Sequence, residues 1–218
     1  MPIAEQKITT IKTGRFFCIG EPNFNVKTIW FVCHGYAQLA RDFLKHFEKF
    51  ACTDKLFIAP EALNRFYKRG FYGEVGASWM TKEGRDEEIK DYITFINNIY
   101  QKITAGLNTP KLSVNLLGFS QGAATAIRVF EANKFNVDRL VLWAGEPPPD
   151  LDYRKIAILS VSAKFILLIG NDDKLVKTEK MKETISLLNE NKVRYELIKY
   201  DGGHELTEDL IRKHLILK

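Results

Sequence analysis

The sequence has few of the residues on which disulfide-rich or metal-centred proteins depend. Among 218 residues there are three cysteines, Cys18, Cys33 and Cys52, and four histidines. An odd number of cysteines without metal-ligand spacing disfavours both a disulfide framework and a structural zinc site. We therefore expect a hydrophobic core, rather than disulfides or a metal, to stabilise the fold, and we expect the protein in a reducing cytoplasm.

Long apolar runs are missing as well. The first fifteen residues, MPIAEQKITTIKTGR, contain no apolar signal segment, and no run elsewhere reaches the length of a membrane span. Hydrophobic residues make up 45% and charged residues 27% of the chain, which is ordinary for a globular protein and disfavours disorder. We expect a cytoplasmic protein without stable membrane insertion.

The charge pattern does not indicate a nucleic-acid partner. The net charge is +5, but the 32 basic and 27 acidic residues are interspersed along the chain. A nucleic-acid-binding protein more often carries a basic stripe or a longer basic run with interleaved aromatics. The closest approach here is the short stretch RFYKR at 65–69. We expect the protein not to bind nucleic acid.

Apolar stretches alternate with segments of helical periodicity. The expected strands are 7–11, 15–19, 28–33, 56–59, 112–118, 140–144, 165–169 and 195–200. Helical faces recur within 39–50, 89–103 and 181–188, and 205–217 can form a last helix. The central strands are continuously hydrophobic, as in parallel strands covered on both faces. This order predicts an α/β fold, a doubly wound, mostly parallel sheet with helices on both faces, with residues 1–218 forming a single domain.

The segment 60–84 differs from the rest of the chain. It lacks a clean period and is rich in aromatics: Phe66, Tyr67, Phe71, Tyr72 and Trp79. Long irregular connections in compact domains are usually functional or disordered, and the aromatic content favours order. Two interpretations remain open: the segment borders a binding cleft, or its aromatics only pack the loop itself.

The stretch GFSQG at 118–122 predicts a nucleophile. Ser120 follows an apolar strand and precedes a segment rich in small residues, so it lies at a sharp strand-to-helix turn. Such a turn forces residues 118 and 122 together, and only small side chains fit there. Chance would produce a GxSxG match roughly 0.02 times in a chain of this composition. A glycine-flanked loop serine is therefore the weaker interpretation.

A serine nucleophile needs a base, and His204 is the best candidate. It lies in the glycine-rich loop DGGH after the last predicted strand, whereas His46 and His214 fall within predicted helices. His34 ends a strand before a glycine and more plausibly shapes a loop. The third member should be a carboxylate that orients the imidazole. Asp172 and Asp173 both follow the strand 165–169, and spacing alone does not choose between them.

Together, these motifs resemble the phospholipase/carboxylesterase family of small α/β-hydrolases, which includes the acyl-protein thioesterases. The resemblance rests on His34-Gly35, GFSQG, the aspartate turn ending in Leu175-Val176, GGH at 202–204, and the ASWM segment at 77–80. It implies an α/β-hydrolase fold without a separate cap domain and a serine hydrolase that needs neither a metal nor another cofactor. The family pattern places the triad acid at Asp173.

The resemblance also suggests an oxyanion hole and a substrate pocket. The backbone N–H of Gln121 is the first expected donor, and the N–H of Tyr36 matches the second family position, with Ala37 as the alternative. The family usually continues His-Gly with a glycine and an aspartate, and has a proline where this chain has Lys174. These departures bear on the acyl pocket, for which the expected residues are Phe71, Trp79, Met80 and Trp143.

We therefore expect a carboxylesterase or thioesterase that acts on a small ester or thioester, acyl lipids included, with activity rising between about pH 6 and 8. Lysophospholipase or peptidase activity with the same triad is the nearest alternative, and dienelactone hydrolases are disfavoured because they use cysteine at the nucleophile position. A non-catalytic α/β-hydrolase used as a binding module is the alternative from another class. The sequence does not reveal the oligomeric state.

Overall fold

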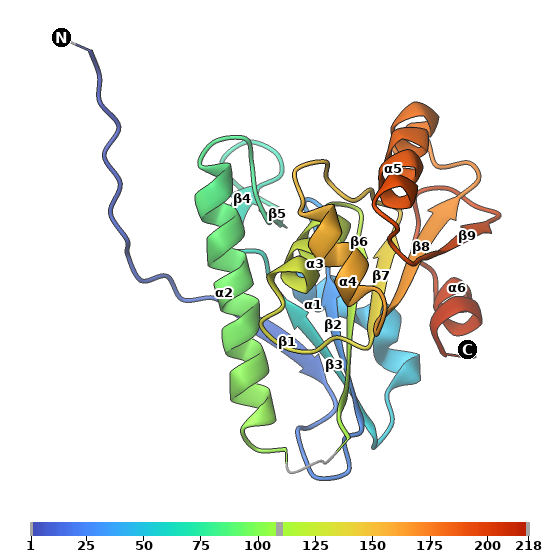
Figure 1. The fold of residues 1–218 in the computed structure, drawn as a ribbon. Helices are drawn as coiled ribbons and strands as arrows, with labels where there is room; N and C mark the ends of the chain where they lie inside the picture. The colour runs from blue at the N-terminus through green and yellow to red at the C-terminus, as the bar shows by residue number, and fades with distance from the viewer. Residues whose placement is uncertain (1, 108–110, 217–218) are drawn as a thin grey trace.

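A twisted seven-stranded sheet forms the centre of the computed structural model, which describes residues 2–107 and 111–216 (Figure 1). The strand order is β1-β3-β2-β6-β7-β8-β9. Only the edge strand β1 is antiparallel to its neighbour; the other pairs in this sheet are parallel. The strands are β1 (Phe16–Ile19), β2 (Thr28–Cys33), β3 (Lys55–Pro60), β6 (Ser113–Phe119), β7 (Arg139–Trp143), β8 (Lys164–Gly170) and β9 (Glu196–Tyr200).

Helices cover both faces of this sheet. The first face packs against α2 (Arg85–Thr104), α3 (Gln121–Ala132), α4 (Tyr153–Leu159) and α5 (Thr178–Glu190). The second packs against α1 (Ala40–Leu44), the 3-10 helix η1 (Lys45–Phe50), α6 (Glu208–Ile211) and the π-helical turn η2 (Arg212–Ile216). The predicted doubly wound α/β architecture is therefore confirmed.

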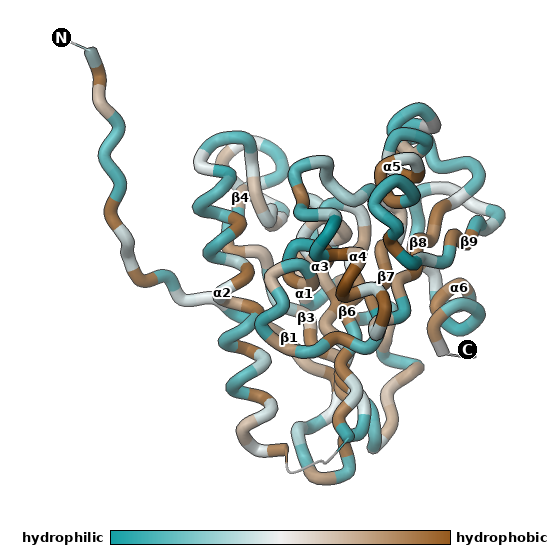
Figure 2. Tube along the Cα trace, viewed as in Figure 1, coloured by the Kyte–Doolittle hydropathy of each residue, from teal (hydrophilic) through white to brown (hydrophobic). Residues whose placement is uncertain are grey.

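The continuous hydrophobic runs follow from this two-sided covering. Successive side chains of a strand point to opposite faces, so Ile29 and Phe31 of β2 enter one core while Trp30 and Val32 enter the other. Polar residues at either set of positions would be buried without solvent. Figure 2 shows the result as hydrophobic central strands, whereas α2 alternates between hydrophilic and hydrophobic residues along its length.

Two predictions from the sequence need correction. Residues 7–11 form no strand; they are exposed and belong to a segment that extends away from the body of the protein (Figure 1). The two hydrophobic side chains of this segment, Ile8 and Ile11, are 94% and 98% exposed, so no buried apolar face holds it against the edge strand β1. The segment 60–84 is not wholly irregular, since β4 (Asn64–Tyr67) and β5 (Val75–Ser78) form an antiparallel hairpin.

The parallel strands bring several loops together at one edge of the sheet. Their carboxyl ends meet there, so the turns after β2, β6, β7 and β8 lie next to one another, followed by the loop after β9. Ligands of open α/β sheets bind beyond this edge. The predicted catalytic residues all lie in these turns and loops.

Candidate active site

Ser120 occupies a strained turn between β6 and α3. Its φ and ψ angles are 55° and −119°, which a residue with a side chain rarely adopts. The turn is closed by contacts that leave no room for a Cβ atom. A Cβ on Gly118 would lie 2.0 Å from the Gly122 carbonyl oxygen, and one on Gly122 would lie 2.1 Å from the Cys33 carbonyl oxygen. Gly118 therefore has the steric role that the GFSQG motif predicts, whereas Gly122 must be small because the end of β2 passes beside it.

His204 and Asp173 form a hydrogen-bonded pair. The imidazole Nδ1 lies 2.8 Å from Asp173 Oδ2, although the residues are separated by 31 positions. The other carboxylate oxygen, Oδ1, accepts the backbone N–H groups of Leu175 and Val176 at 2.9 and 3.2 Å. These two donors fix the rotamer of the buried Asp173 side chain. Asp172, the other candidate from the sequence, is exposed.

Ser120 and His204 face a common cavity of about 310 Å³. Its walls are the start of the loop after β7 (Ala144, Gly145 and Glu146) and residues 175–177 and 180 around the start of α5. The Phe119 ring packs against the His204 imidazole, with ring centroids 5.1 Å apart. A reacting carbonyl placed in this cavity would be within reach of both side chains.

The backbone near Ser120 offers two candidate oxyanion donors. Gln121 is the first residue of α3, where N–H groups lack partners within the helix. On the β2 side, a Cβ on Gly35 would approach the Ser120 Cβ to 3.3 Å, so this turn passes beside the nucleophile. The Ala37 N–H is already donated to the Ala77 carbonyl at 2.9 Å. Among the residues that the structure describes, the Tyr36 N–H has no such acceptor, which favours Tyr36 over Ala37.

The Gln121 side chain has a role that the motif did not reveal. Its amide oxygen accepts the Trp79 N–H at 3.1 Å, and its Nε2 donates to the Met80 carbonyl at 3.0 Å. The residue after Ser120 thus ties the start of α3 to the chain leaving β5. No local pattern could have indicated this contact, because the partners are more than 40 positions apart.

His34 is a structural residue, as expected. It is buried, its Nδ1 lies 2.8 Å from the Gly35 carbonyl oxygen, and its Nε2 accepts the Ala62 N–H at 3.1 Å. Burial lowers the pKa of His34, although the contact with Gly35 and the charge of Glu61 oppose this shift. The neutral imidazole therefore links the turn after β2 to the chain leaving β3.

The four predicted pocket residues do not line the Ser120 cavity. Trp79 and Trp143 are buried, and their indole N–H groups donate to the His34 carbonyl and the Tyr200 hydroxyl. Met80 is half-buried against the core, and Phe71 is 85% exposed at the hairpin tip. The sequence could not separate core aromatics from cavity aromatics, because both types follow strands.

The cavity wall is instead a mixture of charged and apolar side chains. Glu146, Lys177 and Lys180 line it together with Leu175 and Val176. Burial raises the pKa of Glu146, and the nearby Lys180 partly offsets this effect. Charged side chains of both signs therefore border the space beside His204.

Neither a metal centre nor a membrane span is found in the described part of the chain. Residues 2–107 and 111–216 contain no group of three or more His, Cys, Asp and Glu side chains that could hold a metal ion. Within the same ranges, no helix is both long and apolar enough to cross a membrane.

The sheet topology, the strained serine turn and the residues at the sheet edge define an α/β-hydrolase fold. Solved structures of other proteins share it, including the following three. Zea mays acyl-protein thioesterase 2 has a TM-score of 0.68 at 18% identity, covering 92% of this chain and 96% of that one. A phospholipase/carboxylesterase from Dyadobacter fermentans has a TM-score of 0.66 at 17% identity, with coverages of 96% and 99%. Esterase PE8 has a TM-score of 0.62 at 17% identity, with coverages of 93% and 96%.

The sequence also matches a protein family directly. Residues 59–208 match the FSH1 serine hydrolase family, and the chain belongs to that family. A search of curated proteins finds no match. The predicted membership of a serine hydrolase family is therefore confirmed, the family being FSH1, and the likeness to the thioesterase and the two esterases confirms the predicted fold.

Proposed function

We propose that the protein hydrolyses carboxylic esters or thioesters through an acyl-enzyme on Ser120. The observation that carries this proposal is the His204–Asp173 hydrogen bond of 2.8 Å at the cavity that Ser120 also lines. A serine hydroxyl is a weak nucleophile alone, and an oriented imidazole is the base that activates it. Membership of a serine hydrolase family supports the same chemistry.

In the proposed mechanism, Ser120 Oγ attacks the substrate carbonyl carbon while His204 Nε2 accepts the hydroxyl proton. Asp173 keeps the proton of His204 on Nδ1 and stabilises the imidazolium that forms. The backbone N–H groups of Gln121 and Tyr36 donate to the oxyanion of the tetrahedral intermediate. His204 then gives its proton to the leaving alcohol or thiol, and the acyl group remains on Ser120. A water molecule, deprotonated by His204, releases the carboxylic acid.

The proposal is tested with Ser120→Ala. Its turnover of p-nitrophenyl acetate should fall by about 10⁵ to 10⁶-fold, because the covalent step is removed. The variant should also lose labelling by a fluorophosphonate probe. Ser162→Ala is a matched control, since Ser162 is exposed after α4 and bonds only to a nearby backbone carbonyl.

Two results would contradict the proposal. Turnover by Ser120→Ala at the rate of the unaltered protein would exclude Ser120 as the nucleophile. A folded, unaltered protein that neither labels with the probe nor turns over an ester would favour the binding-module alternative.

A further inference from the structure

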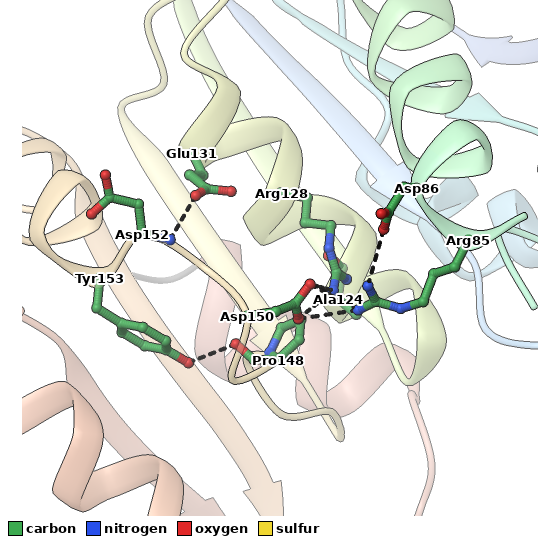
Figure 3. A network of polar contacts seen from close by, with 9 residues as sticks. All are labelled: Arg85, Asp86, Ala124, Arg128, Glu131, Pro148, Asp150, Asp152 and Tyr153. Carbon is green, nitrogen blue, oxygen red and sulfur yellow. Dashed lines mark hydrogen bonds and ion pairs between the residues drawn. The ribbon is translucent and has the colours of Figure 1, made fainter. Parts of the chain in front are cut away.

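The loop after β7 is held to two helices by a network of polar contacts (Figure 3). Asp150 lies between two guanidinium groups, those of Arg128 from α3 and Arg85 from α2. Arg128 Nη2 contacts the two carboxylate oxygens at 2.8 and 3.1 Å, and Arg85 Nη2 contacts them at 3.1 and 2.9 Å. Tyr153 donates its hydroxyl to the Pro148 carbonyl at 2.9 Å.

Arg128 is the unusual member of this network. Its side chain is only 3% exposed, whereas that of Asp150 is 43% exposed. A buried guanidinium is costly unless it is paired; its other contacts include a 3.4 Å bond to the Ala124 carbonyl in its own helix and the Tyr92 hydroxyl, whose pKa it lowers against the larger effect of burial. Burial raises the pKa of Asp150, but hydrogen bonds from Arg85 and Arg128 outweigh it, so the net shift is downward. Asp150 is therefore ionised at neutral pH and pairs with both cations.

The loop between this anchor and the cavity is stiff. Pro147, Pro148 and Pro149 separate Asp150 from Glu146, and each proline fixes its own φ angle. The residue before a proline is restricted as well, which includes Glu146. At the other end, a Cβ on Gly145 would lie 2.5 Å from the Ser120 carbonyl oxygen, so the loop begins against the nucleophile turn. Glu146 is thus held between two fixed points.

One rigid helix connects both fixed points. Ser120 caps the N-terminus of α3, and Arg128 lies eight residues further along, a rise of about 12 Å. The distance between Ser120 and Arg128, which holds the Glu146 loop through Asp150, is therefore set by α3 itself. Glu146 and His204 line the same cavity, so a leaving group that takes its proton from His204 occupies the space that Glu146 borders.

We propose that Arg128 is a positioning residue for this hydrolysis: through Asp150 and the three prolines it holds the Glu146 wall and thereby determines how well a bulky leaving group binds. This inference rests on the serine hydrolase function proposed above. It assigns no contact between Arg128 and the reacting atoms.

The test compares phenyl acetate with 2-naphthyl acetate, which share an acyl group and differ in the size of the leaving group. Arg128→Met removes the charge and keeps most of the side-chain volume. We expect its KM for 2-naphthyl acetate to rise about tenfold, with less than about a twofold change in KM for phenyl acetate and in kcat for either ester. Arg128→Lys, which can still pair with Asp150, should restore part of the loss.

Asp150→Asn tests the same contact from its exposed partner, in case Arg128→Met prevents folding. It should raise the KM for 2-naphthyl acetate selectively, and combining it with Arg128→Met should add little. Lys49→Met is the control, because it breaks an exposed ion pair with Glu208 on the other face of the sheet. Equal losses for both esters, or unchanged KM in folded Asp150→Asn, would overturn the positioning role. If the unaltered protein hydrolyses neither ester, the hydrolase function itself is refuted.

Discussion

Asp173→Asn is the substitution whose effect the site geometry defines most closely. The new side-chain amide has one oxygen and one NH₂ group to place where two carboxylate oxygens stood. The backbone N–H groups of Leu175 and Val176 both point at Oδ1, at 2.9 and 3.2 Å, so the amide oxygen must remain there. The NH₂ group then faces His204 Nδ1 at the position of Oδ2. His204 must accept this hydrogen bond, which forces its own proton onto Nε2.

The consequence for catalysis is large. With its proton on Nε2, the imidazole has no lone pair for the Ser120 hydroxyl. Flipping the amide to restore the tautomer would leave two N–H groups without acceptors, at about 1–3 kcal/mol each. Holding the base in the wrong tautomer costs about 10⁴-fold in kcat in a related triad, which corresponds to about 5 kcal/mol of barrier. The fold should be preserved, because the substitution is isosteric.

The assay is steady-state hydrolysis of p-nitrophenyl acetate, with thermal melting as a check of folding. Asp172→Asn is the matched control, since Asp172 lies in the same turn and is exposed. We expect Asp173→Asn to lose about 10⁴-fold in kcat with little change in melting temperature, and Asp172→Asn to stay within about twofold. Comparable losses in both variants, or more than a tenth of the activity in Asp173→Asn, would refute the assignment.

Two further predictions concern Gly122, beside Ser120, and the buried His34. Gly122→Ala should lower the melting temperature by roughly 5–10 °C and impair ester hydrolysis, because its Cβ would meet two backbone carbonyls at 2.1 and 2.6 Å. Gly106→Ala is the control, since a Cβ there would have no described atom within 4 Å. Equal melting temperatures of the two variants would contradict the steric argument. Burial lowers the pKa of His34, so the unfolded chain binds a proton below about pH 6.5 that the folded protein excludes. The free energy of unfolding, measured with urea, should therefore decrease as pH falls below about 6.5, and His34→Gln should lose this part of the pH dependence.

Local sequence patterns predicted much of the fold. Continuous hydrophobic runs identified the parallel strands, because burial on both faces leaves no position for a polar side chain. The prediction failed at residues 7–11 because the segment buries neither of its isoleucines, Ile8 and Ile11, against the sheet. The β4–β5 hairpin was missed because the segment 60–84 shows no clean period in its sequence.

The candidate site was predictable where a residue's role depends on its immediate neighbours. The GFSQG motif was informative because the backbone around Ser120 leaves room only for glycine at 118 and 122. The loop DGGH and the aspartate turn were recognisable from their positions after strands. The pocket aromatics were not predictable, because Trp79 and Trp143 look the same in sequence whether they line a cavity or fill the core.

By itself, the sequence determined the strands of the main sheet, the turn that holds Ser120 and the small set of residues that could serve it. The family resemblance suggested Asp173 and Tyr36, but only the tertiary structure brings Asp173 to His204, bonds the Ala37 N–H to Ala77 and lets Arg128 reach Asp150. The physical reason is that each contact joins segments far apart in the chain, with His204 31 positions from Asp173 and Arg128 22 positions from Asp150. Such distances depend on how the strands and helices pack together, and no local pattern of residues records them.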